Sequence, residues 1–180
     1  MNLEIERKFI VDPLNEDYLN LIKESAATIE NRYYLFKNGG IELRFTSLKK
    51  GDDTTDYTLD RMEVKDETLT VRTKERLQIS KEEFDSLLML LQTTKSGVEP
   101  IIRYSYNIGE NPKVQIKAYG GKFENLIRAE IEFESKKECA NYKPLDWMGT
   151  EISNTPIGND VTLADLSPEE FKEYMDSLGG

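Results

Sequence analysis

Two pairs of glutamates, each with a single residue between its members, are the first candidates for chemistry. Glu4 and Glu6 lie at the start of the chain, and Glu130 and Glu132 lie much later. Both pairs occur in segments where polar and apolar residues alternate, so the two carboxylates of a pair share one face of a β-strand. Carboxylate oxygens are hard ligands, and two such pairs on adjacent strands suit Mg²⁺ or Mn²⁺.

Basic residues occupy one face of several other alternating segments. The candidates for binding an anion are Lys8, Arg44, Arg72, Lys74, Arg76, Arg103 and Lys117. Both lysine and arginine bind phosphate, and the planar guanidinium of arginine can do so with two hydrogen bonds. Carboxylates that hold a divalent cation beside converging bases are typical of a polyphosphate site, where the bases neutralise charge that develops during phosphoryl transfer. The pattern therefore predicts a small-molecule triphosphate or polyphosphate as the ligand.

The composition excludes several classes of mechanism and of partner. The chain contains no histidine, so catalytic triads, zinc sites and phosphotransfer steps that need imidazole are excluded. Its single cysteine, Cys139, cannot form a disulfide within the chain, which fits a reducing compartment. The formal net charge is −10, so the far field repels phosphates and duplex nucleic acid is not an expected partner.

The length of the chain and its apolar segments predict a single domain over residues 1–180. A chain of 180 residues can bury a sizeable core without disulfides or structural metal. The longest apolar run, Leu87–Leu91, is far too short to cross a bilayer. The acidic N-terminus differs from signal and transit peptides. We therefore expect a cytoplasmic protein without a membrane partner.

Eight segments alternate polar and apolar residues and predict β-strands. They cover residues 3–10, 31–37, 40–47, 56–64, 68–79, 100–108, 113–119 and 126–134. Short connections that contain Gly or Asn suit hairpins between consecutive strands. Eight strands with few helices predict an α+β fold, in which an antiparallel sheet closes into an eight-stranded barrel with covering helices.

Four segments carry helix signals. The first begins at residues 13–15 and extends to about residue 27, and the other three begin after residues 80, 135 and 167. Each of these three has a serine at its start and a glutamate three residues later, and Ser80 with Glu83 forms a capping box. The pairs are Ser80 with Glu83, Ser135 with Glu138, and Ser167 with Glu170.

Two arrangements of the charged strand faces are compatible with this pattern. In a half-buried sheet the polar faces point into water, which is the commonest reason for alternation. In a barrel the charged faces can instead point into the lumen, while the apolar faces point outward beneath amphipathic helices. Two observations favour the barrel. The charged faces contain few uncharged polar residues, and acids concentrate on the first and last strands whereas bases concentrate on the strands between them.

The charged residues also lie within motifs that resemble those of a known family. The segment Glu4-Ile5-Glu6-Arg7-Lys8 resembles the N-terminal Glu-x-Glu-x-Lys signature of the CYTH superfamily, the triphosphate tunnel metalloenzymes. Further motifs follow in the family's order: Arg32-Tyr33-Tyr34-Leu35, Ile41-Glu42-Leu43-Arg44-Phe45, Arg103-Tyr104, Arg128-Ala129-Glu130-Ile131-Glu132-Phe133 and Trp147-Met148-Gly149-Thr150-Glu151-Ile152. The resemblance spans roughly residues 1–160.

This resemblance implies an eight-stranded antiparallel tunnel with a charged lumen, and it assigns roles to residues. The two Glu-x-Glu pairs match the acidic positions near the metal. Lys8 matches the signature lysine, Arg44 and Arg103 match phosphate ligands, and Arg72 falls near a basic position. Lys8 and Arg44 are therefore the expected catalytic residues.

The family also implies an activity. Its members include inorganic, thiamine and RNA triphosphatases and class IV adenylyl cyclases, so we expect hydrolysis of an inorganic, nucleoside or other organic triphosphate with Mg²⁺ or Mn²⁺. Two alternatives stay open, a class IV adenylyl cyclase-like activity and a noncatalytic protein that binds polyphosphate or a nucleotide. CYTH proteins can dimerise, so a homodimer is one expected state.

Several positions depart from the family pattern. Thr46 stands where the third strand often carries a second arginine. The fifth strand presents Arg72, Lys74 and Arg76 where the family often alternates an arginine with glutamates, and Lys117 stands where an aspartate is often found. The lumen is therefore expected to differ from that of the familiar triphosphatases, in its substrate or in its catalytic residues.

Overall fold

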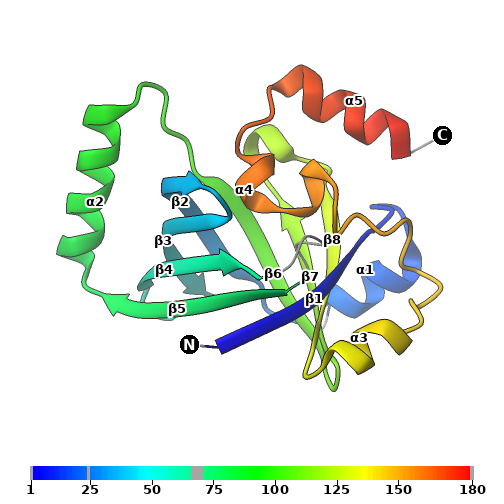
Figure 1. Cartoon of the computed structure of the whole chain (residues 1–180). Coiled ribbons are helices and arrows are strands. Elements are labelled where there is room, and N and C mark those ends of the chain that lie inside the picture. The colour runs from blue at the N-terminus through cyan, green and yellow to red at the C-terminus, as the bar shows by residue number, and fades with distance from the viewer. Residues whose placement is uncertain (1, 24, 66–70, 179–180) are drawn as a thin grey trace.

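The computed structural model describes residues 2–23, 25–65 and 71–178 (Figure 1). Its strands are β1 (Asn2–Ile10), β2 (Thr28–Asn38), β3 (Ile41–Lys50), β4 (Asp56–Val64), β5 (Val71–Ile79), β6 (Ile101–Glu110), β7 (Lys113–Tyr119) and β8 (Ile127–Phe133). Over these ranges the strands close into an antiparallel barrel in the order β1-β5-β4-β3-β2-β6-β7-β8. The α+β barrel expected from the alternation is thus confirmed; of the expected strand 68–79, residues 68–70 lie outside the described ranges.

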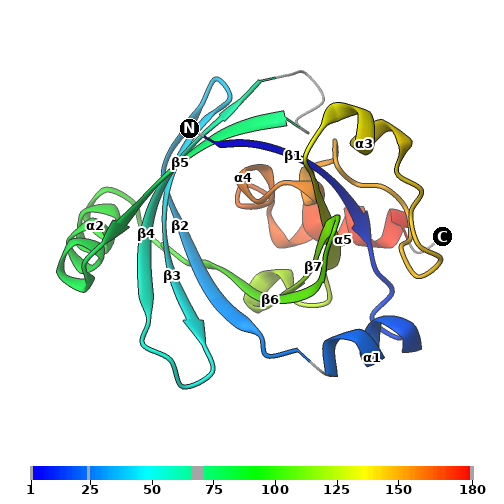
Figure 2. The same ribbon diagram turned by 90° about the horizontal axis from the view of Figure 1, so that it is seen from below.

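The helical elements lie around the barrel and across one end of it. They are α1 (Glu16–Lys23), α2 (Lys81–Thr94), α3 (Lys136–Asn141), α4 (Asp160–Leu163) and α5 (Pro168–Leu178), with the short 3₁₀ turns η1 (Gly121–Phe123) and η2 (Pro156–Gly158). Figure 2, a view from below, shows α1, α2 and α3 outside the ring of strands and α4 within its outline. Among the described helices, none has the length and apolar character that crossing a bilayer requires.

The apolar faces of the strands point outward, and helices cover much of them, although Leu3 and Leu77 are 57% and 63% exposed. Phe84 of α2 packs edge-on against Phe45 of β3, with ring centroids 5.1 Å apart. Tyr18 of α1 belongs to a second apolar cluster with residues of β1, β7 and β8, and Phe171 of α5 belongs to a third. Apolar side chains are buried between the strands and the helices outside the barrel. The charged side chains point into the lumen, as the barrel interpretation predicted.

Local signals fix the ends of most helices. The Ser80 hydroxyl accepts from the amide of Glu83, whose carboxylate accepts from the Ser80 amide, so the expected capping box before α2 is present. Ser167 and Glu170 exchange the same two bonds before α5. The first helix is shorter than expected, however, because β2 already begins at Thr28, where it pairs with β6.

The segment after α3 returns along β1 and then crosses the end of the barrel. The amides of Gly149 and Ile152 donate to the carbonyls of Ile10 and Lys8, which extends the ladder at this edge of β1. The chain then turns tightly at Gly158, where a Cβ would lie 1.8 Å from the Ile152 carbonyl oxygen. This contact requires glycine, and it places the next residues, Asn159 and Asp160, inside the barrel end.

Gly158→Ala tests this packing. The added methyl group must displace either the Ile152 backbone or the turn that carries Asp160, so we expect a loss of about 2 kcal/mol or more in urea unfolding. The control is Gly51→Ala, where φ is 54° and a Cβ meets no atom within 4 Å. Left-handed strain alone should cost this control about 1 kcal/mol. Equal losses in the two variants would contradict the close-packing argument.

Candidate functional site

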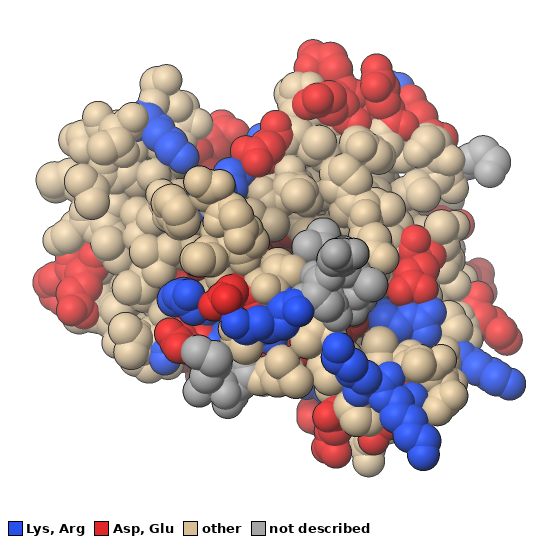
Figure 3. Space-filling view, in the orientation of Figure 1, with Lys and Arg blue, Asp and Glu red and all other residues tan. Residues whose placement is uncertain are grey.

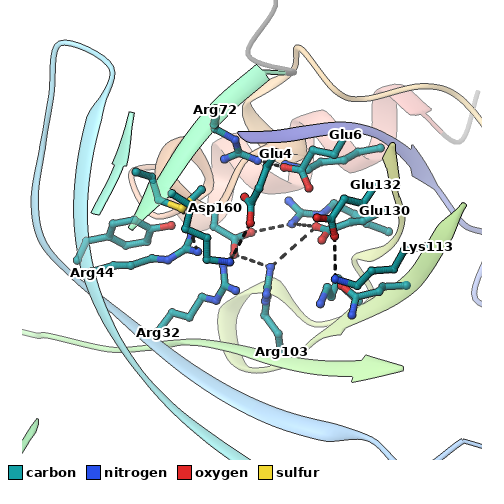
Figure 4. Close-up of a pocket in the computed structure, with 17 residues that line it drawn as sticks. Glu4, Glu6, Arg32, Arg44, Arg72, Arg103, Lys113, Glu130, Glu132 and Asp160 are labelled. Atoms are coloured by element: carbon teal, nitrogen blue, oxygen red, sulfur yellow. Dashed lines mark hydrogen bonds and ion pairs between the residues drawn. The ribbon is translucent and has the colours of Figure 1, made fainter. Parts of the chain in front are cut away.

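The barrel encloses a cavity of about 90 Å³ whose wall is almost entirely charged (Figure 4). Of the described residues that line it, nine are lysine or arginine and five are aspartate or glutamate, so positive charges exceed negative charges by four. The bases are Lys8, Arg32, Arg44, Arg72, Lys74, Arg103, Lys113, Lys117 and Arg128, and the acids are Glu4, Glu6, Glu130, Glu132 and Asp160. An enclosed space with this imbalance attracts a multivalent anion, although the whole chain carries −10.

The structure brings ten of the eleven sequence-predicted site residues to this cavity. The exception is Arg76, which lies at the lower mouth of the barrel, where it binds Asp60 through Nε and Nη2 at 2.7 and 2.8 Å. Thr46, which stands at a departure from the family pattern, is buried on β3. Alternation therefore located the residues correctly, while their roles stay predictions.

The two Glu-x-Glu pairs lie on hydrogen-bonded neighbours, as the metal hypothesis required. In the β1–β8 ladder Glu6 is opposite Glu132, and Lys8 is opposite Glu130. Each carboxylate nevertheless has a basic partner in the lumen. The pairs are Lys74 with Glu4 at 2.8 Å, Lys8 with Glu6 at 3.0 Å, Arg72 with Glu6, Arg128 with Glu130 at 2.6 Å and Lys113 with Glu132 at 2.7 Å.

These ion pairs decide what kind of metal site the residues can form. The part of the chain that the structure describes contains no group of three or more His, Cys, Asp or Glu side chains placed to hold a metal ion. Mg²⁺ commonly uses only one or two carboxylates together with substrate phosphates. Glu6 and Glu132 lie opposite each other on the neighbouring strands β1 and β8, so they fit a metal ion held jointly by protein and substrate. A site made wholly of protein ligands does not fit.

Sequence reasoning missed the residue at the centre of the network, Asp160 of α4. Its carboxylate accepts from Arg32 at 3.1 Å, Arg103 at 2.9 Å, Arg128 at 2.8 Å and the Tyr119 hydroxyl at 2.5 Å. Burial alone would raise the pKa of Asp160, but these arginines and the Tyr119 hydrogen bond lower it well below its usual range. This carboxylate thus joins four strands, β2, β6, β7 and β8, to the C-terminal segment.

Acids also lie on the strands that were expected to carry bases. Glu30 on β2 accepts from Arg103 at 2.7 Å and from Ser105, and Asp60 on β4 binds Arg44 and Arg76. The expected segregation of acids to the first and last strands is therefore wrong. The physical reason is that buried cations need counter-ions nearby, because removing a charge from water costs several kcal/mol.

Several buried polar atoms that the structure describes have no hydrogen-bond partner. They include the Tyr34 hydroxyl, Glu42 Oε2, the Thr46 hydroxyl and the Nε atoms of Arg72 and Arg103. Leaving such a group unpaired costs about 1–3 kcal/mol each. Of these residues, Tyr34, Arg72 and Arg103 line the cavity, so their free donors are available to a ligand that enters the lumen.

Burial also changes the titration of the lumen bases. It lowers the pKa of Lys8 to about 8, although Glu130 opposes the change. Burial lowers the pKa of Lys117 to about 8 as well, against the attraction of Glu30. Burial would likewise lower the pKa of Arg44, but Tyr34, Glu42 and Asp60 raise it overall, so this arginine stays charged.

Lys117→Met tests the state of the buried lysines. Between about pH 8 and the ordinary lysine pKa of 10.5, the unfolded chain binds more protons than the folded chain, so stability rises with pH in this window. Removing Lys117 should lower the slope of unfolding free energy against pH by up to about 1.4 kcal/mol per unit. Urea unfolding from pH 8 to 10 measures this slope. The control is Lys50→Met at an exposed lysine; a slope unchanged in Lys117→Met would refute the assignment.

Comparisons with known proteins bear on the fold. No protein-family model matches the sequence, and no curated protein does. The crystal structure of the inorganic triphosphatase NE1496 is 24% identical, with a TM-score of 0.57 over 93% of this chain and 98% of that one. A conserved hypothetical protein from Pyrococcus furiosus is 17% identical, with a TM-score of 0.51 over 76% of this chain and 83% of that one. The PH1819 protein from Pyrococcus horikoshii OT3 is 18% identical, with a TM-score of 0.50 over 76% and 82%. The chain therefore has the tunnel fold that its resemblance to the CYTH superfamily implies.

Proposed function

We propose that the protein hydrolyses a triphosphate bound in the lumen of the barrel. The observation that carries this proposal is that nine lysine or arginine residues and only five acids are among the described residues that line the cavity, although the whole chain is acidic. A triphosphate carries several negative charges in a row and therefore matches both the charge and the elongated form of a tunnel. The inorganic triphosphatase NE1496, which has the same fold, supports the choice of substrate class.

Arg44, Arg103 and Lys8 are the residues proposed to meet the phosphate oxygens. Each is buried and held by carboxylates before any substrate arrives: Arg44 by Asp60, Arg103 by Glu30 and Asp160, and Lys8 by Glu6. Donors fixed in this way need little reorganisation when charge develops on the transferred phosphoryl group. Low local dielectric strengthens the same interactions. The bases thus lower the barrier rather than only binding the substrate.

Hydrolysis also requires a group that takes a proton from the attacking water. The water oxygen forms a bond to phosphorus, the bridging P–O bond breaks, and the leaving phosphate chain keeps the bonding electrons. Glu42 suits the proton transfer, because burial raises its pKa and its Oε2 atom accepts no hydrogen bond within the described ranges. It lies 3.9 Å from both Arg44 and Arg72.

Mg²⁺ or Mn²⁺ belongs to the proposal as a companion of the triphosphate. Glu6 and Glu132, with Glu4 and Glu130 beside them, are the residues that would hold it together with substrate oxygens. When bound, the ion would neutralise phosphate charge and polarise the phosphoryl group. We also infer that the enzyme acts in the cytoplasm on a small-molecule substrate, in agreement with its acidic chain and single cysteine. A homodimer remains part of the proposal.

A noncatalytic polyphosphate binder is the second candidate. Lys74 and Arg76 favour it, because they stand where the resemblance implies glutamates. In this structure the two bases pair with Glu4 and Asp60, so fewer carboxylates are left for a catalytic role. A class IV adenylyl cyclase would use the same lumen but a nucleophile from the substrate itself. Neither the binder nor the cyclase would release inorganic phosphate from inorganic triphosphate, and this distinguishes both from the proposed triphosphatase.

Arg44→Ala separates hydrolysis from binding. If Arg44 meets charge in the transition state, its removal should lower kcat by about a hundredfold, or about 3 kcal/mol, and weaken binding less. Phosphate release from inorganic triphosphate, measured with and without Mg²⁺ or Mn²⁺, gives kcat. Arg61→Ala is the matched control, because Arg61 lies on the same pair of strands but pairs with Glu63 outside the cavity. Parent protein that binds triphosphate but releases no phosphate would establish the binder instead.

A further inference from the structure

Lys8, one of the bases proposed to meet phosphate, is held at three of its atoms by the segment that returns along β1. Its amide donates to the Ser153 hydroxyl at 2.9 Å, and its carbonyl accepts from the Ile152 amide at 2.8 Å. Its Nζ atom donates to Oδ1 of Asn159 at 3.2 Å. The backbone and the side chain of Lys8 are thus fixed by the same stretch of chain.

The side-chain amide of Asn159 is itself held in one orientation. Its Nδ2 atom donates to the Ser153 carbonyl at 2.9 Å, which directs Oδ1 towards Lys8. The reversed orientation would place donor against donor and acceptor against acceptor. Asn159 is only 1% exposed and is not among the described residues that line the central cavity. It is therefore placed to act on Lys8 rather than on a bound ligand.

The ammonium group of Lys8 carries three N–H donors. One is directed at Asn159, and a second is directed at Glu6 Oε1, 3.0 Å away. Lys8 also lines the cavity, so its remaining donor is available to a phosphate oxygen. Because the bonds of the ammonium nitrogen are tetrahedral, fixing two donors fixes the direction of the third.

Glu6 is shared among several cations, whereas Asn159 is not. The Glu6 carboxylate binds Arg72 as well as Lys8, and it is one of the groups proposed to hold a metal ion with the substrate. Among the described contacts, Lys8 is the only cation that the Asn159 side chain binds. Asn159 can therefore keep its hold on Lys8 when the partners of Glu6 change.

The turn that carries Asn159 is anchored by apolar side chains. Ile152, Ile157 and Leu163 are no more than 1% exposed, and they belong to one cluster with Phe171 of α5. Figure 3 shows acidic side chains gathered over α5, whose apolar residue Phe171 is buried beneath them. The turn is thus packed under a helix, which gives Asn159 the rigid support that a positioning group needs.

We propose that Asn159 is a positioning residue, which aims the free donor of Lys8 at the phosphate oxygens in the lumen. This inference rests on the proposed function, in which Lys8 meets charge that develops on the transferred phosphoryl group. A misplacement of about 1 Å in a reacting geometry can cost about a hundredfold in rate. A residue without contact to the substrate can therefore control turnover.

Asn159→Ala, alone and combined with Lys8→Met, tests the proposal as a double-mutant cycle. Phosphate release from inorganic triphosphate gives kcat, and calorimetry with a non-hydrolysable analogue gives the affinity. We expect Asn159→Ala to lower kcat by about tenfold and the affinity by less than about threefold. In the Lys8→Met background the same substitution should lower the residual kcat by less than about twofold, because the group that Asn159 positions has been removed.

Two further variants separate positioning from a structural role. Thr162→Val is the matched control, because the Thr162 hydroxyl donates to the carbonyls of Pro156 and Asn159 in the same turn and its described bonds do not include Lys8. Its kcat should stay within about twofold of the parent value. Asn159→Asp keeps an oxygen that accepts from Lys8 but loses the donor to Ser153, so we expect kcat within about threefold of the parent. Asn159→Ser, whose hydroxyl is too short to reach Lys8, replaces Asn159→Ala if that variant does not fold.

Three results would overturn the inference. They are an equal loss of kcat from Asn159→Ala with and without Lys8, a loss in Thr162→Val as large as that in Asn159→Ala, and an Asn159→Asp variant no more active than Asn159→Ala. Failure of the proposed function is a different outcome, in which the parent binds the analogue but releases no phosphate. The cycle is then measured on the affinities, and additive losses from Asn159→Ala and Lys8→Met would contradict positioning there. A parent that neither binds the analogue nor releases phosphate would overturn both.

Discussion

Cations enclosed in a barrel must be neutralised when no substrate is present, and the described structure is arranged around this requirement. Each buried ion would cost several kcal/mol if it were left unpaired in the lumen. Asp160 and Glu30 compensate the arginines in the middle, and Glu4, Glu6, Glu130 and Glu132 compensate the bases nearer β1 and β8. The described residues that line the central cavity nevertheless include more bases than acids, and that excess makes the lumen a site for an anion rather than a closed core.

The same requirement explains the C-terminal segment. The three arginines on Asp160 come from β2, β6 and β8, and Tyr119 comes from β7, so one carboxylate links four strands to α4. Gly158 allows the turn that delivers it. Asp160 therefore both closes this end of the barrel and neutralises the arginines. A substitution at this position would change the fold and the candidate site together.

Features that depend on neighbouring residues could be predicted from the sequence, whereas contacts between residues far apart in the chain could not. Alternation is a local property, and it located the strands, the inward residues such as Lys8 and Arg103, and the outward apolar faces. Glu30 was missed because the second strand was expected to begin at residue 31, three positions after β2 begins at Thr28. Asp160 lies in an irregular segment and contacts Arg32 across 128 positions, so no periodicity could indicate it.

The same network explains the bases Lys74, Arg76 and Lys117, which stand where the resemblance led us to expect acids. Lys74 and Arg76 on β5 face Glu4 and Asp60, so the bases found there have acidic partners on both neighbouring strands. Lys117 lies beside Glu30 and Ser105, where burial lowers its pKa to about 8. Each of these bases thus has an acidic partner, and the described lining of the lumen keeps an excess of positive charge.

A crystal structure with a non-hydrolysable triphosphate analogue tests this account most directly. We expect phosphate oxygens inside the barrel, within hydrogen-bond distance of Arg44 and Arg103. Some of the carboxylate contacts of these arginines should be replaced by contacts to phosphate. An analogue bound only on the outer surface, with the ion pairs of the lumen intact at saturating concentration, would contradict it.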